Sequence, residues 1–392
     1  MNMTLNVTRA CNLACRYCTQ SHEDIVMKEE TAKQAIDFFC SIQNPSEGQV
    51  QISFYGGEPL LSTDLIYTIV PYARQKLQEI GKKVVFEITT NGVLIEDVFV
   101  RYARRNRILI AVSHDGVLHD YTRKNTSADG TKAVVDEKLK LLLKYMPATP
   151  VMMTLHPDSV SAAVDSIKLF YNMGVRHVNM TPAHGSKVHW TDESLASLKE
   201  QYEKIALLYE EWNQGENSFV FGPFDNKIRD YIEKRNGCLK RCRIGMDKMV
   251  VDTDGQIYPC IQMTGDAEFC IGDIRSGRDE HAITQLEERR EAPADCRICA
   301  LKTRCTYKCA CANKLETGNI DKPSAFQCEY ERMLIPIADG AASKLINKDN
   351  RAFVKRMFMN DLVAVTTVPG PNASETAIAS TVSNSAGESI NE

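Results

Sequence analysis

The sequence predicts an α/β protein made of six strand–helix units followed by a small cysteine-rich domain. Short apolar runs alternate with longer segments of helical spacing as far as about residue 212, a pattern typical of a parallel sheet with crossover helices. The 14 cysteines are unevenly spread: four lie within the first 40 residues, and ten lie between Cys238 and Cys328. Two cysteine-rich regions therefore flank a cysteine-free body.

The units of the body can be assigned from local patterns. The expected strands are Met3–Val7, Val50–Tyr55, Val84–Thr89, Ile108–Val112, Val151–Leu155 and His177–Met180. The expected helices are Lys28–Phe39, Asp64–Ile80, Glu96–Arg105, Lys132–Tyr145, Asp158–Met173 and Asp192–Trp212. Such a repeat can close into a partial barrel or lie open as a doubly wound sheet. In both cases ligands gather at the carboxyl ends of the strands.

Three further elements are expected after the body. Met249–Tyr258 predicts a β-hairpin around an Asp-Gly turn, which would present Cys260 where its second strand ends. Ala325–Leu345 has helical spacing and would pack back on the body. The stretch 366–392 is rich in Ser, Ala, Thr and Asn, lacks aromatic residues, and is predicted to be disordered.

Composition and charge exclude several classes of protein. The net charge is -4, so neither nucleic acid nor an anionic membrane is an expected partner. No stretch approaches the ~20 apolar residues of a membrane span, and the N-terminus lacks the basic and apolar regions of a signal peptide. We therefore expect a cytoplasmic protein. Because the cytosol keeps thiols reduced, its many cysteines predict metal ligation and not a disulfide framework.

The N-terminal cysteines, Cys11, Cys15 and Cys18, lie on one loop directly after the first strand. Iron–sulfur clusters are held by cysteine thiolates in short runs of this kind. Three thiolates leave one iron of a four-iron cluster open to a small molecule. A zinc site is the alternative, with His22 as a fourth ligand, although zinc sites usually combine two cysteine pairs or a pair with histidines.

Polar turns follow the next three strands. The run Gly56-Gly57-Glu58-Pro59 follows the second strand, and Thr89-Thr90-Asn91-Gly92 follows the third. The fourth strand is followed by Ser113-His114-Asp115-Gly116 and then by Arg123. Each run alone is an ordinary turn, since Asn-Gly and Asp-Gly are common turn pairs. Their shared place at the edge that carries the cysteine loop favours a binding site.

With these motifs, the first two-thirds of the chain resembles the radical S-adenosylmethionine (radical SAM) superfamily. The resemblance implies a partial (β/α)6 TIM-type barrel in which Cys11, Cys15 and Cys18 hold a catalytic 4Fe–4S cluster. In that family the amino and carboxylate groups of SAM chelate the open iron. An electron from the cluster splits SAM, and the resulting 5′-deoxyadenosyl radical abstracts a hydrogen atom from the substrate.

The resemblance also implies the residues that contact SAM. Tyr17 would lie against the adenine, and Gly56, Gly57 and Glu58 would receive the amino group. Thr90, Asn91 and Ser113 would line the ribose side. Arg123 would face the carboxylate, for which a guanidinium is a suitable partner.

The second cysteine region resembles the SPASM extension of radical SAM enzymes that modify peptides. The resemblance implies two auxiliary 4Fe–4S clusters. Their ligands would be Cys238, Cys242, Cys260 and Cys309 for the first cluster, and Cys296, Cys299, Cys305 and Cys328 for the second. Cys270 or Cys311 could stand in for Cys238. Eight thiolates would equally make two zinc sites.

These assignments predict a domain organisation. Residues 1–215 would form the radical SAM barrel, 216–237 a bridging segment, and 238–348 the SPASM domain, with the disordered tail at 366–392.

The function expected from the resemblance is that of a peptide maturase, which forms a thioether or carbon–carbon crosslink in a ribosomal peptide. A sulfatase-maturating (formylglycine-forming) enzyme and a cofactor-biosynthesis enzyme are alternatives. Sulfatase-maturating enzymes typically place an aspartate after the cysteine that matches Cys260, where this chain has Ile261. Asp254, Asp266 and Asp273 are candidates to replace that base. The non-enzyme alternative is an iron–sulfur electron carrier, which would not need the polar turns.

The expected partners follow from this function. They are a peptide or small-protein substrate and a reducing protein such as flavodoxin or ferredoxin. Many peptide maturases carry a leader-recognition domain before the barrel, where this chain has ten residues. Recognition would then use a separate leader-binding protein, or the barrel and extension alone.

Overall fold

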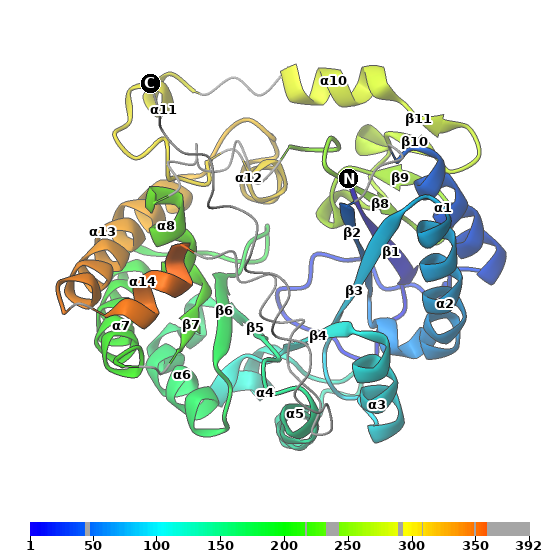
Figure 1. Ribbon diagram of the computed structural model, residues 1–392. Helices are drawn as coiled ribbons and strands as arrows, with labels where there is room; N and C mark the ends of the chain where they lie inside the picture. Colours follow the sequence, from blue (N-terminus) through cyan, green and yellow to red (C-terminus); the bar gives the residue numbers. More distant parts are fainter. Residues whose placement is uncertain are drawn as a thin grey trace, which may run out of the picture. The chain divides into compact units, whose positions relative to one another are not determined.

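A mostly parallel sheet organises the computed structural model (Figure 1). The described residues are 1–43, 48–215, 218–232, 243–288, 293–307, 309–348 and 350–358. Within them, the sheet has nine strands in the order β7-β6-β5-β4-β3-β2-β1-β8-β9. The predicted disordered tail, together with Cys238 and Cys242, lies outside the described residues.

The six predicted strand–helix units form the body of this sheet. Their strands are β1 (Asn2–Thr8), β2 (Gly48–Gly56), β3 (Lys82–Thr90), β4 (Ile108–Ser113), β5 (Val151–Leu155) and β6 (His177–Pro182). Their helices are α1 (Glu29–Ser41), α2 (Thr63–Glu79), α3 (Asp97–Asn106), α5 (Lys132–Tyr145), α6 (Ala163–Asn172) and α7 (Asp192–Trp212). Short helices connect them: η1 (Pro59–Ser62), η2 (Gly116–Leu118), α4 (His119–Thr122) and η3 (Pro157–Ala162).

The strand order decides between the two architectures that the periodicity left open. Strands β1 to β7 (Val220–Phe221) are neighbours in chain order, and every adjacent pair is parallel. The large helices lie on the outer side of these strands in Figure 1. A doubly wound sheet reverses its strand order at a switch point, whereas this order runs in one direction, as in a barrel. The α/β prediction is confirmed.

The hairpin β8 (Lys248–Val251) and β9 (Ile257–Tyr258) has the predicted Asp-Gly turn, but it also extends the body's sheet. Strand β8 pairs parallel with β1, which places the hairpin beside the first strand of the chain. The buried carboxylate of Asp252 accepts a hydrogen bond from Asn6 at 2.7 Å and pairs with Arg9. The sheet and this carboxylate therefore attach the second cysteine region to the segment that leads into the first.

The rest of the second region consists of short elements and one long helix. They are α8 (Gly222–Ile232), η4 (Ile261–Met263), η5 (Ala267–Phe269), β10 (Gly272–Asp273), β11 (Gly277–Arg278), α10 (Glu280–Glu288), α11 (Ala294–Ile298), α12 (Ala310–Thr317), α13 (Ala325–Asn347) and α14 (Arg351–Phe358). Helix α13 packs on α7 and α8, as predicted for Ala325–Leu345. Its buried Glu331 pairs with buried Lys227 of α8 at 2.6 Å and accepts from Thr306 at 2.6 Å, which secures the loop that carries Cys305.

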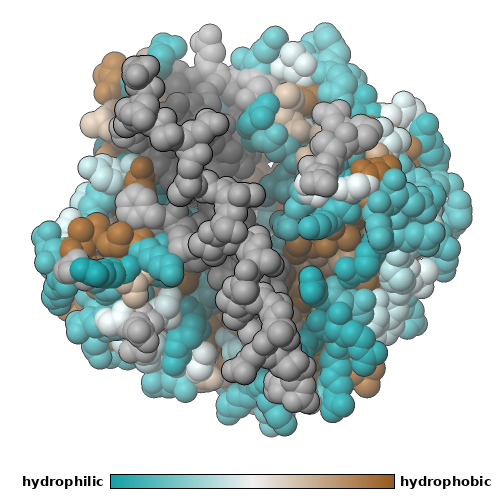
Figure 2. Space-filling view, viewed as in Figure 1, coloured by the Kyte–Doolittle hydropathy of each residue, from teal (hydrophilic) through white to brown (hydrophobic). Residues whose placement is uncertain are grey.

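The surface agrees with the composition. Hydrophilic side chains cover most of the coloured surface in the view of Figure 2. In the described part of the chain, no helix is both long enough and apolar enough to cross a membrane.

The glycine pair after β2 is required by backbone packing. Gly57 N donates to Thr8 O at 2.9 Å, and Glu58 N donates to Ala10 O at 2.8 Å. A Cβ at Gly56 would lie 2.2 Å from Thr8 O, and one at Gly57 would lie 2.2 Å from Ala10 O. The glycines therefore let the end of β2 contact the backbone that enters the cysteine loop.

We expect Gly57→Ala to displace the segment Thr8–Ala10 and with it the start of the cysteine loop. Overpacking of this kind costs about 1–3 kcal/mol. Iron bound by the N-terminal loop should fall after anaerobic reconstitution, and the thermal midpoint should drop. The matched control is Gly340→Ala in α13, where a Cβ meets nothing within 4 Å and helix propensity improves. Wild-type iron content in Gly57→Ala would contradict this account.

Candidate functional site

A cavity of about 490 Å³ lies at the carboxyl ends of the strands. Its lining includes Cys11, Cys15 and Cys18 from the first cysteine region, and Cys309 and Cys311 from the second. It also includes all of the predicted SAM contacts, which are Tyr17, Gly56, Gly57, Glu58, Thr90, Asn91, Ser113 and Arg123. One cavity thus collects residues from most of the chain, as the strand-end pattern predicts. Their SAM-binding roles stay predictions.

Two contacts join the cysteine regions beside this cavity. Thr19 Oγ1 donates to Gln262 Oε1 at 2.5 Å, and Gln20 Nε2 donates to the carbonyl of Ile261 at 3.3 Å. Thr19 and Gln20 follow Cys18 directly, and Ile261 follows Cys260. The N-terminal loop is therefore held against the segment after Cys260.

Glu58 is a structural acceptor as well as a cavity residue. Its Oε1 accepts from Leu60 N at 3.0 Å and from Thr90 Oγ1 at 2.7 Å, and its Oε2 accepts from Asn91 N at 2.7 Å. Burial raises the pKa of Glu58, and the hydrogen bonds from Asn91 and Thr90 oppose that shift. A carboxylate has about four acceptor positions, so one remains on Oε2 for the predicted SAM amino group.

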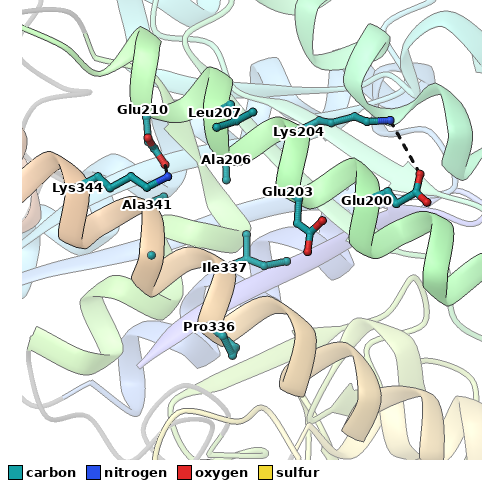
Figure 3. A pocket seen from close by; sticks show the side chains of 11 residues that line it. Glu200, Glu203, Lys204, Ala206, Leu207, Glu210, Pro336, Ile337, Ala341 and Lys344 are labelled. Carbon is teal, nitrogen blue, oxygen red and sulfur yellow. Dashed lines mark hydrogen bonds and ion pairs between the residues drawn. The ribbon is translucent and has the colours of Figure 1, made fainter.

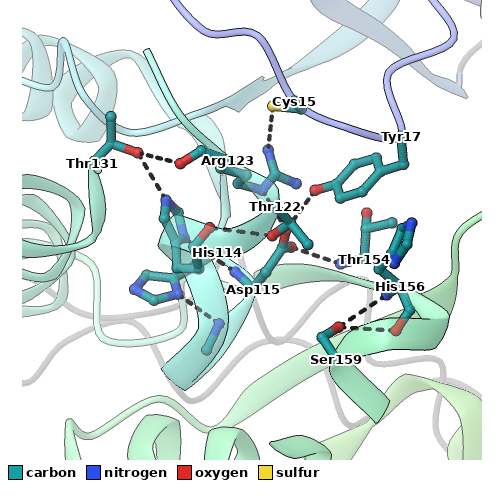
Figure 4. A network of polar contacts seen from close by, with 12 residues as sticks. Cys15, Tyr17, His114, Asp115, Thr122, Arg123, Thr131, Thr154, His156 and Ser159 are labelled. Carbon is teal, nitrogen blue, oxygen red and sulfur yellow. Dashed lines mark hydrogen bonds and ion pairs between the residues drawn. The ribbon is translucent and has the colours of Figure 1, made fainter. Parts of the chain in front are cut away.

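The buried carboxylate of Asp115 is the centre of a network at the end of β4 (Figure 4). Its Oδ2 accepts from Tyr17 Oη at 2.6 Å, Thr122 Oγ1 at 2.7 Å and Arg123 Nε at 2.9 Å. Its Oδ1 accepts from Thr154 N of β5 at 2.9 Å. Burial alone would raise the pKa of Asp115, but the Arg123 charge and these donors hold it below its ordinary value.

Arg123 links this network to the cysteines. Its Nη1 lies 3.9 Å from Cys15 Sγ, and its guanidinium lies over the Tyr17 ring at 5.4 Å from the ring centre. Burial lowers the pKa of Arg123, but the neighbouring charges of Asp115, Tyr17 and Cys15 outweigh burial and raise this pKa above its ordinary value. A permanent cation therefore lies beside the central thiol of the loop. Burial raises the pKa of Cys15, and the charge of Arg123 opposes that rise.

The sequence offered only a weak signal for Asp115, because Asp-Gly after a strand predicts a turn. The neighbouring histidines support the same turn. His114 Nε2 lies 2.7 Å from Asp136, while buried His119 accepts from Asp115 N at 3.3 Å. Burial, with the charges of His114 and Arg123, lowers the pKa of His119 to about 3, so its ring is neutral.

The N-terminal thiols fit an iron–sulfur cluster in donor chemistry and in place. They line one cavity from a single loop, and cysteine thiolates are the ligands that such clusters take. Burial raises the pKa of Cys11 to about 11, so ligation would displace a proton from that thiol. Across the described ranges, no three Cys, His, Asp or Glu side chains are grouped so as to hold a single metal ion.

Seven of the eight described cysteines of the second region fall into two groups, and Cys270 belongs to neither. Cys309 Sγ lies 3.4 Å from Cys311 Sγ, and hydrogen bonds to Cys260 and Cys309, with burial, raise the pKa of Cys311. In the other group, burial and then the charges of Cys328 and Cys299 raise the pKa of Cys296. Cys305 belongs with them, because Cys328 is among the charges that raise its pKa to about 12, after burial and Glu331.

This grouping resembles the predicted ligand sets, with one addition. Cys311 joins Cys260 and Cys309, whereas Cys238 and Cys242 lie outside the described residues. Cys270 instead donates to Gly272 O at 3.4 Å. The sequence left Cys270 and Cys311 equivalent, since only the fold brings one of them to Cys309.

The three aspartates predicted as candidate bases are not among the residues that line the cavity. Asp254 Oδ1 accepts from Gln256 N at 3.0 Å in the hairpin turn. Asp266 pairs with Lys314 at 2.5 Å, and Asp273 pairs with Arg275 at 3.2 Å. The geometry gives their predicted role no support.

A second depression lies between α7 and α13 (Figure 3). It has a volume of about 440 Å³ and is crossed by the Lys344–Glu210 ion pair at 2.9 Å. No cysteine or predicted site residue is among the residues that line it. The cavity at the strand ends is therefore the candidate active site.

Comparisons with known proteins agree with this site. The sequence model of the Radical SAM superfamily matches residues 5–170. A serine-type anaerobic sulfatase-maturating enzyme of Bacteroides thetaiotaomicron is 22% identical over 395 residues, covering 90% of this chain and 94% of the relative. A cysteine-type anaerobic sulfatase-maturating enzyme of Clostridium perfringens is 22% identical over 270 residues, covering 64% of this chain and 71% of the relative.

Solved structures share the fold. The structure of native anSMEcpe with bound AdoMet and Cp18Cys peptide has a TM-score of 0.73 at 17% identity, covering 89% of this chain and 98% of that one. Streptococcus suis SuiB bound to precursor peptide SuiA has a TM-score of 0.60 at 16% identity, covering 83% of this chain and 75% of that one. The predicted partial TIM-type barrel is confirmed.

The matched residues 5–170 include the cysteine loop and the turns after β2, β3 and β4 that line the cavity. An electron carrier would not need such a cavity, so the non-enzyme alternative is set aside. Residues 5–170 therefore form a radical SAM domain, and the protein is an enzyme that uses SAM and 4Fe–4S chemistry.

Proposed function

We propose that this radical SAM enzyme oxidises a cysteine or serine side chain within a peptide segment to an aldehyde. The observation that carries the proposal is the similarity to a serine-type sulfatase-maturating enzyme over 90% of this chain and 94% of that relative. The similarity therefore spans both cysteine regions and not the barrel alone. The peptides named in the anSMEcpe and SuiB structures support a peptide substrate.

The cavity suits such a substrate. Its volume of about 490 Å³ is in the ordinary range for ligand pockets, about 300–1,000 Å³. It is lined on one side by the N-terminal cysteine loop and on the other by Cys309, Cys311 and Leu315 of the second region. A peptide side chain entering between them would meet the N-terminal cysteines and also Cys309 and Cys311 of the second region.

In this proposal Cys11, Cys15 and Cys18 hold the catalytic cluster, which together with SAM supplies the hydrogen-abstracting radical. Arg123 orients the SAM carboxylate and is itself oriented by Asp115. Tyr17 lines the cavity on the same side as Arg123. Glu58 Oε2 offers its remaining acceptor position to the amino group of SAM. The protein thus supplies position and shelter, while the cofactor supplies the chemistry.

The two groups of cysteines in the second region are the proposed sites of auxiliary clusters. Cys242, Cys260 and Cys309 would hold the first, with either Cys238 or Cys311 as the fourth ligand. Cys296, Cys299, Cys305 and Cys328 would hold the second. A reducing protein such as flavodoxin or ferredoxin remains the expected electron donor.

Peptide crosslinking, the function first expected from the sequence, has weaker support. It depends on the lower similarity to SuiB, with a TM-score of 0.60. Ile261 after Cys260 still distinguishes this chain from the usual sulfatase-maturating pattern. An oxidising enzyme must therefore take its base from elsewhere.

The test uses anaerobically reconstituted protein with SAM, dithionite and three synthetic peptide pools. The pools share randomised flanking residues and differ only in carrying Cys, Ser or Ala at one central position. We expect hydrazide-reactive aldehyde in the Cys or Ser pool and none in the Ala pool. Loss of two hydrogens without hydrazide reactivity would indicate a crosslink and contradict the proposal, as would 5′-deoxyadenosine with unchanged peptides.

Asp115→Asn tests the proposed SAM contacts. Removing this charge leaves Arg123 without its buried counter-ion, so we expect SAM affinity to fall by about tenfold, which corresponds to ~1.4 kcal/mol. Iron content should stay at the wild-type level. Equilibrium dialysis against labelled SAM measures the affinity, and a colorimetric iron assay on the same sample measures the iron content.

The matched control is Asp158→Asn. Asp158 accepts from Tyr121 and lies 4.0 Å from Arg16, but its side chain is 56% exposed. Exposed pairs contribute about 0–1 kcal/mol, so its SAM affinity should stay within about twofold. Equal SAM affinity in Asp115→Asn and the wild type would show that Arg123 does not bind SAM through this network.

A further inference from the structure

A histidine–carboxylate pair lies at the cavity, at the end of β6. His184 Nδ1 is 3.0 Å from Glu316 Oε1, and Gly185 N donates to the same oxygen at 3.4 Å. His184 lines the cavity, and its side chain is 24% exposed. Glu316 comes from α12, the helix that also carries Cys311.

The pair defines the tautomer of His184. An ionised carboxylate can only accept a hydrogen bond, so the proton of the neutral ring lies on Nδ1. Nε2 then carries the free lone pair, as in other histidines oriented by a carboxylate. Among the described residues, no hydrogen-bond partner of Nε2 is found.

The surrounding loop holds the ring in place. Ala183 N donates to Leu155 O at 2.9 Å, and Trp190 Nε1 donates to Ala183 O at 3.0 Å. Trp190 stacks on Phe326 with ring centres 4.6 Å apart, and the His184 ring lies edge-on to Phe326 at 6.1 Å. These hydrogen bonds and ring contacts therefore hold the loop that carries His184 in place.

The other titratable side chains that line the cavity in the described part are already assigned or engaged. Glu58 accepts three hydrogen bonds, and His22 Nε2 lies 3.4 Å from Cys18 Sγ. Tyr17 donates to Asp115, and Arg123 is a cation. Burial raises the pKa of Tyr55, so its phenol keeps its proton and is not a base. The cysteines are proposed cluster ligands. His184 is left as the side chain whose Nε2 has no partner among the described residues and that lines the substrate space.

We propose that His184 is the catalytic base that removes the proton from the oxygen or sulfur of the oxidised side chain, with Glu316 as its positioning residue. The inference rests on the proposed function. In sulfatase-maturating enzymes, the aspartate after the cysteine that matches Cys260 serves as this base. Ile261 stands at that position here and cannot accept a proton, so His184 would take over the role.

The step balances as follows. Conversion of Cβ–OH or Cβ–SH to a C=O or C=S bond removes a hydrogen atom from carbon, and a proton and an electron from the remaining group. The SAM chemistry takes the hydrogen atom. The O–H or S–H bond breaks with its electron pair left on the heteroatom, and the proton moves to His184 Nε2. The electron would pass to an iron–sulfur cluster and replace the one spent in cleaving SAM. For a cysteine, water then hydrolyses the C=S group to the aldehyde and hydrogen sulfide leaves.

The test measures the ratio of aldehyde to 5′-deoxyadenosine with the peptide pools described above. In His184→Ala, 5′-deoxyadenosine formation, iron content and SAM binding should match the wild type, whereas the ratio should fall by about 100-fold, the lower end of a general base's contribution. Added imidazole should restore part of the ratio, which a purely structural role would not allow. His189→Ala, in the same loop and exposed, should behave as the wild type.

Glu316→Gln is the second variant, and its ratio should fall less, since the base remains but loses its orientation. An unchanged ratio in His184→Ala while the wild type makes aldehyde would overturn the base and leave the proposed function standing. An equal fall of both products without imidazole rescue would overturn it too. If the wild type makes 5′-deoxyadenosine but no aldehyde, the proposed function fails, and the base with it.

Discussion

The active-site end of the barrel depends on one buried carboxylate. Asp115 accepts hydrogen bonds from Tyr17 in the cysteine loop, from Thr122 at the end of α4 and Arg123 directly after it, and from the backbone of β5. A buried charge without partners would cost several kcal/mol. The folded state is therefore stable with these donors placed around the carboxylate. This carboxylate thereby joins three segments that are far apart in sequence, and Arg123 Nη1 lies 3.9 Å from the sulfur of Cys15.

The second constraint is the way the two cysteine regions are joined. The hairpin β8–β9 extends the sheet at β1, and Asp252 pairs with Arg9 two residues before Cys11. Thr19 and Gln20 contact the segment after Cys260 on the far side of the loop. Both ends of the first cysteine loop are therefore attached to the second region, and residues of both regions line one cavity.

The features of the fold that could be predicted from the sequence are those that depend on residues near one another in the chain. The strands and helices of the body are local patterns, and all six predicted strands are present. The predicted helix Asp158–Met173 begins with the tight turns of η3, which hydrophobic spacing does not distinguish from α-helix. Gly56 and Gly57 were singled out correctly, yet their backbone contact with Thr8–Ala10 needed the fold.

Residues that act across long separations could not be found in this way. Asp115 looked like half of a turn, Cys311 like one of two spare thiols, and His184 carried no motif at all. The role of each of these residues depends on contact with a residue that is distant in the chain, as Glu316 is from His184. Asp254, Asp266 and Asp273 stay untested as candidate bases, and the fold engages them in a turn and in ion pairs.

The most direct measurement is anaerobic iron and zinc quantification on the reconstituted protein, coupled to an assay of 5′-deoxyadenosine after reduction with SAM. The account predicts about twelve irons per chain, the sum of three four-iron clusters, with 5′-deoxyadenosine formed. It also predicts that replacing Cys11, Cys15 and Cys18 together by Ala abolishes SAM cleavage but keeps most of the remaining iron. Zinc in place of iron with SAM left intact, or 5′-deoxyadenosine from the triple variant, would contradict it.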